Sequence, residues 1–329
     1  MKDFADQYAN RTVAVVGAHG YLGAALSSAL TNTPARILAV SRQDGVPVQG
    51  AEMLTTDVRD EACWHDILCR AGLIFYVAGN TSVSAAARNP AEALAATLLP
   101  LTHLIAAARD THRVPRVVFA STARVYSPAA ALPVTEDADT SPGSPFGAQN
   151  VAAERMLAAA TAEGIVEAVS LRLGNVYGPS PCNGSIHARN VVSRMTRLAT
   201  RGESLPLYGD GRQVRDYVYV DDVTRAFLIA GVHAGIGGRS LNVASGRGTT
   251  VREMFYGIAE RASRETGMAA RVEEVPWPGG EAPAEQQDFI ADIGRIAAAC
   301  GWTPRIPLDD GLGRLVVQMA HDTADTVSD

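Results

Sequence analysis

Three glycines in one short stretch, Gly17, Gly20 and Gly23, follow an apolar run and precede a helical pattern of small residues. Backbone N–H groups approach a pyrophosphate closely only where no side chain intervenes, and the start of a helix adds partial positive charge. A strand, a glycine turn and a helix in this order are the context in which such a spacing indicates a nucleotide site. We therefore predict a dinucleotide at this turn. The alternative is a glycine-rich turn that holds no ligand.

The end of the next expected strand carries Ser41 and Arg42. Folds that use NAD usually place a carboxylate at this strand end to bind the ribose 2′-hydroxyl, whereas an arginine suits a 2′-phosphate. Serine stands where the acid would be. The sequence therefore predicts NADPH as the cofactor in preference to NADH, and a solvated Arg42 with no ligand is the alternative.

Apolar runs alternate with helical patterns through the first half of the chain. We expect strands over residues 12–16, 35–40, 73–79, 117–122 and 166–173. We expect helices over residues 21–30, 61–70, 90–109 and 146–160. This alternation predicts an α/β fold with a doubly wound parallel sheet, whose ligand crevice lies at the carboxyl ends of the strands.

Beyond Pro179 the alternation fades, and glycine and proline become frequent. We expect residues 1–178 to form mainly a dinucleotide-binding domain. Residues 179–329 are then mainly a smaller C-terminal substrate lobe, with about 214–246 returning to the sheet of the first domain.

The composition is that of a globular protein: the chain has 329 residues, is 47% hydrophobic and carries a formal net charge of −6. Mild acidity without a basic cluster argues against a nucleic-acid partner. The first residues lack the apolar core of a signal peptide. The apolar segment Ala91–Ala108 contains Pro100 and His103 and is expected to be too short for a bilayer. We therefore expect a cytoplasmic protein with no membrane partner.

The cysteines and histidines show no ligand pattern. Cys63, Cys69, Cys182 and Cys300 have neither metal-ligand spacing nor the density of a disulfide scaffold, and we expect free thiols. The seven histidines form no cluster, so we expect no metal. Every basic residue except Lys2 is an arginine, which removes any mechanism that needs a lysine inside the fold.

Several motifs recur in one order over nearly the whole chain. They are Gly17–Gly23, Thr56–Val58, Phe119–Tyr126, Leu173–Pro179, Leu207–Gly211, Arg215–Val223 and Cys300–Pro304. Together they resemble the extended short-chain dehydrogenase/reductase family, which contains nucleotide-sugar epimerases, dehydratases and 4-ketoreductases. The resemblance implies a Rossmann fold with a nicotinamide dinucleotide over the sheet.

The resemblance also implies roles for single residues. Thr122 takes the place of the catalytic serine or threonine that hydrogen-bonds the reacting oxygen. Asn175 and Arg215 stand where family members hold a nucleotide-sugar diphosphate, although a turn asparagine and an ion-paired arginine would explain them equally well. The expected substrate contacts are Asn80, Thr122, Tyr177 and Arg215. The expected cofactor contacts are Gly17, His19, Gly20, Tyr21, Leu22, Gly23, Ser41, Arg42, Asp57, Val58, Val77, Ala78, Gly79, Asn150, Leu173, Asn175 and Val176.

The chain departs from the family at the start of the helix after Pro145. The family pattern there is a tyrosine, three residues and a lysine, in which the tyrosine transfers the proton and the lysine lowers its pKa. Here Phe146 and Asn150 occupy those positions, at the spacing that keeps them on one helix face. A phenyl ring transfers no proton, although Asn150 can still hydrogen-bond the ribose. Thr97 further replaces the asparagine common in the preceding helix.

The loss of the family's tyrosine, lysine and asparagine favours ketone reduction over alcohol oxidation. Removing a general acid or base costs about 10²- to 10⁴-fold, and oxidation of an unactivated alcohol needs the missing base. Reduction needs only a donor for the developing alkoxide, such as Thr122, a water molecule, Tyr126 or the substrate itself. A phenol beside the ketone of an aromatic polyketide supplies such a donor. The sequence thus predicts an NADPH-dependent ketoreductase of an aromatic, angucyclinone-type polyketide, in which cofactor geometry provides most of the acceleration.

Two other functions stay open at this point. One is a nucleotide-sugar 4-ketoreductase or epimerase that works through a displaced tyrosine, with Tyr126 as the candidate. The other is a non-catalytic protein that binds NADP. Alanine-rich stretches at 91–108 and 151–160 resemble the helices through which family members form dimers, but close packing inside a monomer explains them equally. We expect a monomer or a homodimer.

Overall fold

The central element of the computed structural model is a seven-stranded sheet in the order β10-β6-β5-β4-β1-β2-β3, in which every neighbouring pair is parallel. The structure describes residues 2–43, 48–79, 83–179, 190–277 and 287–327. The strands of this sheet are β1 (Thr12–Val16), β2 (Arg36–Ser41), β3 (Ala51–Thr55), β4 (Leu73–Tyr76), β5 (Arg116–Thr122), β6 (Glu167–Leu173) and β10 (Ser240–Val243).

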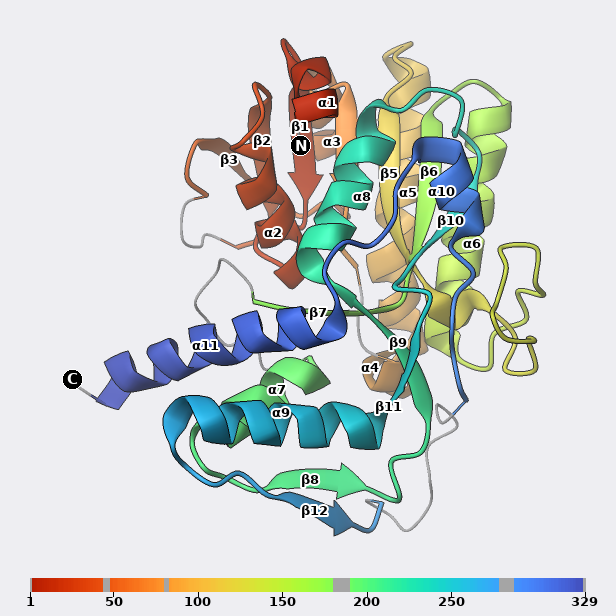
Figure 1. Ribbon diagram of the computed structural model, residues 1–329. Coiled ribbons are helices and arrows are strands. Elements are labelled where there is room, and N and C mark those ends of the chain that lie inside the picture. The colour runs from red at the N-terminus through yellow and green to blue at the C-terminus, as the bar shows by residue number, and fades with distance from the viewer. Residues whose placement is uncertain (1, 44–47, 80–82, 180–189, 278–286, 328–329) are drawn as a thin grey trace.

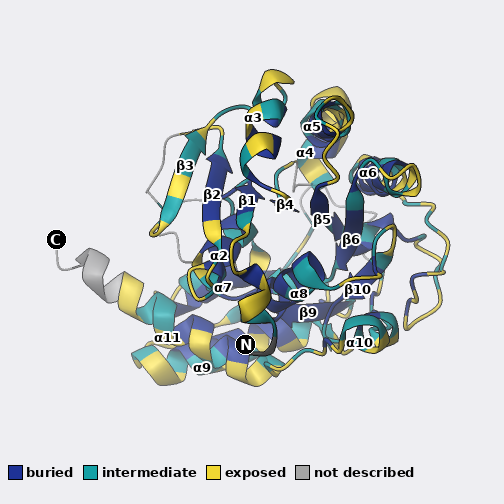
Figure 2. Ribbon diagram, turned by 90° about the horizontal axis from the view of Figure 1, so that it is seen from above, coloured by how far each residue is buried: buried dark blue, intermediate teal, exposed yellow. Residues whose placement is uncertain are grey.

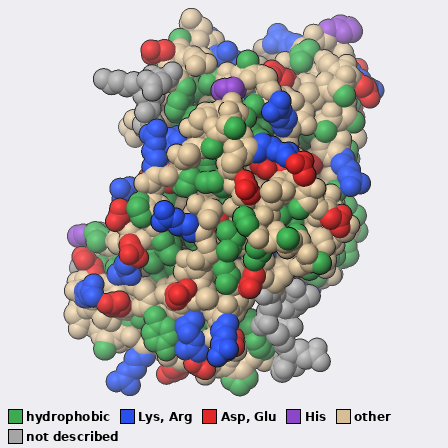
Figure 3. Space-filling model, turned by 45° about the vertical axis from the view of Figure 1, so that its right-hand side comes forward, with side chains coloured by type: hydrophobic (Ala, Val, Ile, Leu, Met, Phe, Trp, Pro, Cys, Tyr) green, Lys and Arg blue, Asp and Glu red, His purple; other side chains and the backbone are tan. Residues whose placement is uncertain are grey.

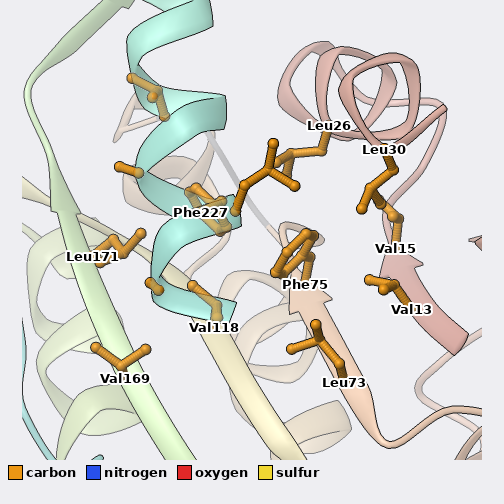
Figure 4. Close-up of a cluster of buried hydrophobic side chains, with 14 of the residues drawn as sticks. Val13, Val15, Leu26, Leu30, Leu73, Phe75, Val118, Val169, Leu171 and Phe227 are labelled. Carbon is orange, nitrogen blue, oxygen red and sulfur yellow. The ribbon is translucent and has the colours of Figure 1, made fainter. Parts of the chain in front are cut away.

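Helices cover both faces of this sheet. One face carries α3 (Ala62–Arg70), α5 (Pro90–Asp110) and α6 (Pro145–Ala162), and the other carries α2 (Tyr21–Leu30), α8 (Val220–Val232) and α10 (Gly294–Cys300) (Figure 2). Because successive strand residues point to opposite faces, Val13 and Val15 join the core under α2 and α8, while Ala14 and Val16 join the core under α3 and α5. Figure 4 shows the first of these two cores.

A second group of strands and helices gathers below the sheet in Figure 1. A three-stranded sheet contains β7 (Asn175–Tyr177), β9 (Val214–Tyr219) and β11 (Gly248–Thr250), and β8 (Leu205–Tyr208) pairs with β12 (Val272–Val275). The helices α7 (Val191–Thr200), α9 (Val251–Thr266) and α11 (Leu308–Val327) pack with them. Short elements complete the described chain: α1 (Lys2–Ala5), η1 (Asp6–Tyr8), α4 (Val83–Arg88) and η2 (Ala123–Val125).

The predicted fold class is confirmed: the sheet is parallel, doubly wound and flanked by helices, and the expected strands and helices lie within three residues of the observed ones. Within the stretch expected to return to this sheet, β10 pairs with β6, whereas β9 pairs with β7 and β11. The domain division at residue 178 stays a prediction.

The expectation that the apolar segment Ala91–Ala108 is too short to cross a bilayer was wrong. α5 has 21 residues and is apolar enough, by length and composition, to cross a bilayer. Proline at its first position and the Asn89 side chain, which accepts from the Glu92 N–H, set its start at Pro90, where the helix was expected to begin. In the structure Leu101, Leu104 and Ala108 lie fully buried between α5 and the sheet. The expected cytoplasmic location and the choice between monomer and homodimer stay predictions.

A buried ion pair ties α6 to the sheet. Arg172 of β6 donates to both carboxylate oxygens of Glu154 at 2.7–3.1 Å, and each side chain is 7% exposed. Ser121 of β5 donates to Glu154 Oε1 at 2.5 Å, and Ser240 of β10 donates to Oε2 at 3.1 Å. One carboxylate thus connects a helix with three neighbouring strands.

Replacing Glu154 with alanine is expected to lower the free energy of unfolding by about 3–5 kcal/mol, because the Arg172 charge would stay buried without its partner. The matched control is Glu163→Ala at the end of the same helix, where an exposed glutamate pairs with the exposed Arg109. That change is expected to cost less than about 1 kcal/mol. Urea unfolding followed by circular dichroism measures the free energy of unfolding of both variants. Equal losses of stability would contradict the role of Glu154 as the partner of a buried charge.

Candidate cofactor and substrate site

A cavity of about 1170 Å³ lies at the carboxyl ends of the sheet strands. It is lined by the glycine turn after β1, by the ends of β2, β4, β5 and β6, and by the first turns of α6 and α9. All but four of the site residues expected from sequence line it. Gly23, Tyr126 and Tyr177 do not, and Asn80 lies outside the described residues.

The glycine turn is too close to its neighbours for side chains. Gly17 has a φ of +94°, and a Cβ on it would lie 2.9 Å from the Ala78 backbone nitrogen. A Cβ on Gly23 would collide with the Gly17 carbonyl, so α2 packs directly on the turn. Gly20 caps α2 without a side-chain hydrogen bond, and Gly20, Tyr21 and Leu22 at the start of this helix line the cavity. This arrangement fits a dinucleotide pyrophosphate.

His19 in the same turn adds an independent indication of a ligand. Its Nε2 atom is buried and has no hydrogen-bond partner, although the residue lines the cavity. Buried polar atoms in folded proteins almost always have a partner. A phosphate oxygen of a bound dinucleotide would supply one.

The end of the cavity beside β2 carries Ser41, Arg42, Asp57 and Val58, as expected. Arg59 joins them: its guanidinium pairs with the Asp57 carboxylate at 2.6 Å and with Glu92 at 3.1 Å. These hydrogen bonds hold the pKa of Asp57 below its usual range. Sequence reasoning missed Arg59, although its position two residues after Asp57 was a usable signal.

Thr122, Phe146 and Asn150 line the same cavity, so the structure brings together the residues expected at the reacting end. Thr122 Oγ1 accepts from the Arg124 N–H at 3.2 Å, which leaves the threonine hydroxyl hydrogen to donate. Asn150 Nδ2 donates to the Phe146 carbonyl at 2.8 Å within α6. The buried Thr97 also lines the cavity, and its hydroxyl has no partner.

Tyr126 is turned away from the reacting end. Its hydroxyl donates to Asn242 Oδ1 at 2.5 Å, and its ring stacks on Phe289. Burial raises the pKa of Tyr126 to about 12. Tyr177 is likewise buried and donates to the Leu308 carbonyl at 3.2 Å. In this arrangement neither hydroxyl has access to a ligand in the cavity.

The far end of the cavity is aromatic and basic. Tyr208 and Trp277 stack with ring centroids 5.5 Å apart, and Phe255 and Tyr217 also line the cavity. Arg215 also lines it, and its guanidinium donates to the backbone carbonyl oxygens of Val214 and Gln287. Trp277 was missed from sequence because it comes from a segment far from the other motifs.

The described part of the chain shows neither a metal-ligand group nor a thiol with a lowered pKa. No group of three potential ligands occurs there, and Cys63, Cys69 and Cys300 form no disulfide. Burial raises the pKa of the Cys63 thiol to about 11. Cys182 lies outside the described residues.

Acidic and basic side chains are interspersed on the face shown in Figure 3.

Comparison with known proteins adds an independent line of evidence. The model of the NAD dependent epimerase/dehydratase family matches residues 13–244. The UDP-glucose 4-epimerase of Azospirillum brasilense is 31% identical and is aligned over 93% of this chain and 91% of its own. The crystal structure of the UDP-glucose 4-epimerase of Thermotoga maritima with UDP-glucose is 27% identical, with a TM-score of 0.84 over 95% of this chain and 99% of that one. MoeE5 in complex with UDP-glucose and NAD is 27% identical, with a TM-score of 0.81 and the same coverage.

Arg42 gives a direct test of the expected cofactor preference. We expect Arg42→Ala to weaken NADPH binding about tenfold and to leave NADH binding within twofold, because only NADPH carries the 2′-phosphate. Tryptophan fluorescence titration measures both affinities without turnover. Arg212→Ala, which removes an exposed arginine that does not line the cavity, is the control. Equal effects of Arg42→Ala on the two cofactors would exclude the 2′-phosphate role.

Proposed function

The chain belongs to the NAD dependent epimerase/dehydratase family, and we propose that within it the protein is an NADPH-dependent ketoreductase that acts on a nucleotide-linked keto sugar. The observation that carries the proposal is the pair Phe146 and Asn150 beside Thr122 in one cavity. The cofactor, when bound, supplies a hydride. The turn at Gly17 would hold its pyrophosphate, and Asn150 would hydrogen-bond its ribose.

The direction of the reaction follows from what Phe146 lacks. An epimerase first removes the proton of a sugar hydroxyl, and this cavity has no tyrosine at the position where the family's base stands. The tyrosines that line it, Tyr21, Tyr208 and Tyr217, belong to α2, β8 and β9 and none to α6, and Tyr126 is turned away. Reduction instead begins from a carbonyl oxygen, which needs only a hydrogen-bond donor such as Thr122 and a final proton from water.

The substrate class is supported by the length of the cavity and by the relatives. The cavity continues from the glycine turn past Asn175 to Arg215 and the stacked rings of Tyr208 and Trp277. A guanidinium suits a diphosphate, and a planar base suits an aromatic wall. The T. maritima epimerase and MoeE5 both bind UDP-glucose. These points favour a nucleotide-linked sugar over the polyketide expected from sequence.

A phenolic polyketide ketone is the second candidate, and Phe146 is the observation that favours it. Such a ketone carries its own acidic neighbour, so a protein acid is dispensable. The most specific form of this candidate is the angucyclinone ketoreductase of the simocyclinone pathway. None of the relatives named above is such an enzyme.

NADPH oxidation by the purified protein tests the proposal. We expect turnover with a nucleotide-linked 4-keto sugar and slower turnover with NADH. Turnover with a phenolic polyketide ketone alone would replace the sugar by the second candidate. NADPH binding without turnover of either ketone would indicate a non-catalytic NADP-binding protein.

Restoring the family's tyrosine separates the two substrate classes. Phe146→Tyr is expected to raise kcat for a sugar ketone at least tenfold, because that ketone has no acidic neighbour, and to leave kcat for a phenolic ketone unchanged. Thr122→Val is expected to lower kcat for either ketone about 10²-fold. Phe255→Tyr, on the far wall of the cavity, is the matched control. A sugar reductase whose kcat does not respond to Phe146→Tyr would contradict this account.

A further inference from the structure

We infer that the guanidinium of Arg59 provides the flat surface on which the adenine ring of the cofactor stacks. The inference rests on the proposed function, because it names the residue that recognises the half of the dinucleotide remote from the reaction. The ligand chemistry is that of a planar purine. Arg59 was not among the site residues expected from sequence.

The order of the strands places the adenine half of a dinucleotide beside β2 and β3. The order runs β6-β5-β4-β1-β2-β3, and the glycine turn that fits the pyrophosphate follows β1. Thr122 at the end of β5 and Phe146 mark the reacting end, so the nicotinamide half extends toward β4 and β5. The pyrophosphate joins the two halves, and the adenine half therefore extends to the other side of β1. The residues that line the cavity there are Ser41, Arg42, Asp57, Val58 and Arg59.

The turn that carries Arg59 has a fixed backbone. The Asp60 N–H donates to the Asp57 carbonyl oxygen at 2.9 Å, which closes the turn. The buried indole of Trp64 donates to the Val58 carbonyl oxygen at 2.9 Å, which anchors the turn on α3. The side chain of Arg59 thus extends from a rigid base.

Every nitrogen of the Arg59 guanidinium donates to a carboxylate. Nε lies 3.1 Å from both oxygens of Asp57, and Nη2 lies 2.6 Å from Asp57 Oδ2. Nη1 lies 3.1 Å from Oε1 of Glu92, in the first turn of α5. The N–H bonds of a guanidinium lie in its plane, so the two carboxylates hold this group by its edge. What it offers a ligand in the cavity is its face.

A guanidinium held in this way suits a planar ring better than a phosphate. A phosphate binds to the N–H edge, and on Arg59 that edge already donates to Asp57 and Glu92. A purine binds to the face, through dispersion and the attraction between the cation and the ring electrons. The Arg59 side chain is 35% exposed, so its face is not covered by the protein.

Arg42 and Arg59 therefore have different tasks at this end of the cavity. Arg42, at the end of β2, is the residue expected to bind the 2′-phosphate. Arg59 binds the adenine ring whether or not that phosphate is present. This difference gives the two arginines separate signatures in binding experiments.

Three ligands separate the ring from the phosphate. ADP-ribose carries the adenine alone, NADH adds the nicotinamide, and NADPH adds the 2′-phosphate as well. Arg59→Lys keeps the charge and loses the flat face, and we expect it to weaken binding of all three ligands about tenfold. Arg42→Ala is expected to weaken binding of NADPH alone. Titration calorimetry measures each dissociation constant without turnover.

Two further variants separate stacking from support of the local structure. Arg59→Tyr restores a flat ring but has no charge to pair with the two carboxylates, and we expect it to bind ADP-ribose about threefold more tightly than Arg59→Lys. Arg70→Lys is the matched control, because Arg70 also pairs with two carboxylates, Glu52 and Asp66, but does not line the cavity. It is expected to leave all three dissociation constants unchanged. Thermal unfolding confirms that each variant folds.

Three outcomes would overturn the inference. The first is unchanged affinity of Arg59→Lys for ADP-ribose. The second is a loss confined to NADPH, which would make Arg59 a ligand of the 2′-phosphate. The third is an Arg59→Tyr variant that binds ADP-ribose no more tightly than Arg59→Lys, which would show that the ion pairs matter and the flat face does not.

The proposed function fails or stands by a different measurement. If the wild type reduces neither ketone but the variants show the expected pattern of affinities, the adenine site stands and the proposed function falls. If the wild type reduces the sugar ketone and Arg59→Lys binds all three ligands as the wild type does, the proposed function stands and the adenine site falls.

Discussion

The structure depends on the close approach of three backbones at the end of β1. Gly17 packs against the chain that leaves β4, and α2 packs on Gly17 through Gly23. These contacts bring a helix start, a strand end and the loop after β4 to one point, and a single methyl group at Gly17 or Gly23 would separate them. The shape of the cavity at this turn and the packing of α2 on the sheet both follow from this absence of side chains.

The residues at the reacting end of the cavity contribute little to holding the fold together. Among the described residues the Asn150 side chain bonds to the Phe146 carbonyl of its own helix, and Phe146 lines the cavity. The connection of α6 to the sheet lies one turn further on, at Glu154, Arg172 and Ser121. A tyrosine and a lysine can therefore be exchanged for phenylalanine and asparagine while the scaffold stays intact. This separation explains how a chain can keep the family's architecture and lose its acid.

How far the sequence predicts the structure differs between local and long-range features. The glycine turn and the alternation of strands and helices follow from local patterns, and they were predicted. The meeting of Thr122, Phe146 and Asn150 was expected only from the resemblance to the family. Tyr126 illustrates the limit. It stands four residues after Thr122, yet its hydroxyl bonds to Asn242, 116 residues away. Only the return of β10 to the sheet and the packing of Phe289 decide where that ring points.

Arg124 shows the same limit from the other side. In the sequence it is one of many arginines, and the expected catalytic role fell on Thr122, which takes the place of the family's serine or threonine. Its place becomes informative only when Gly147, 23 residues later, is seen packed on its carbonyl. That contact joins the end of β5 to the start of α6, the two elements between which the family's catalytic residues are divided.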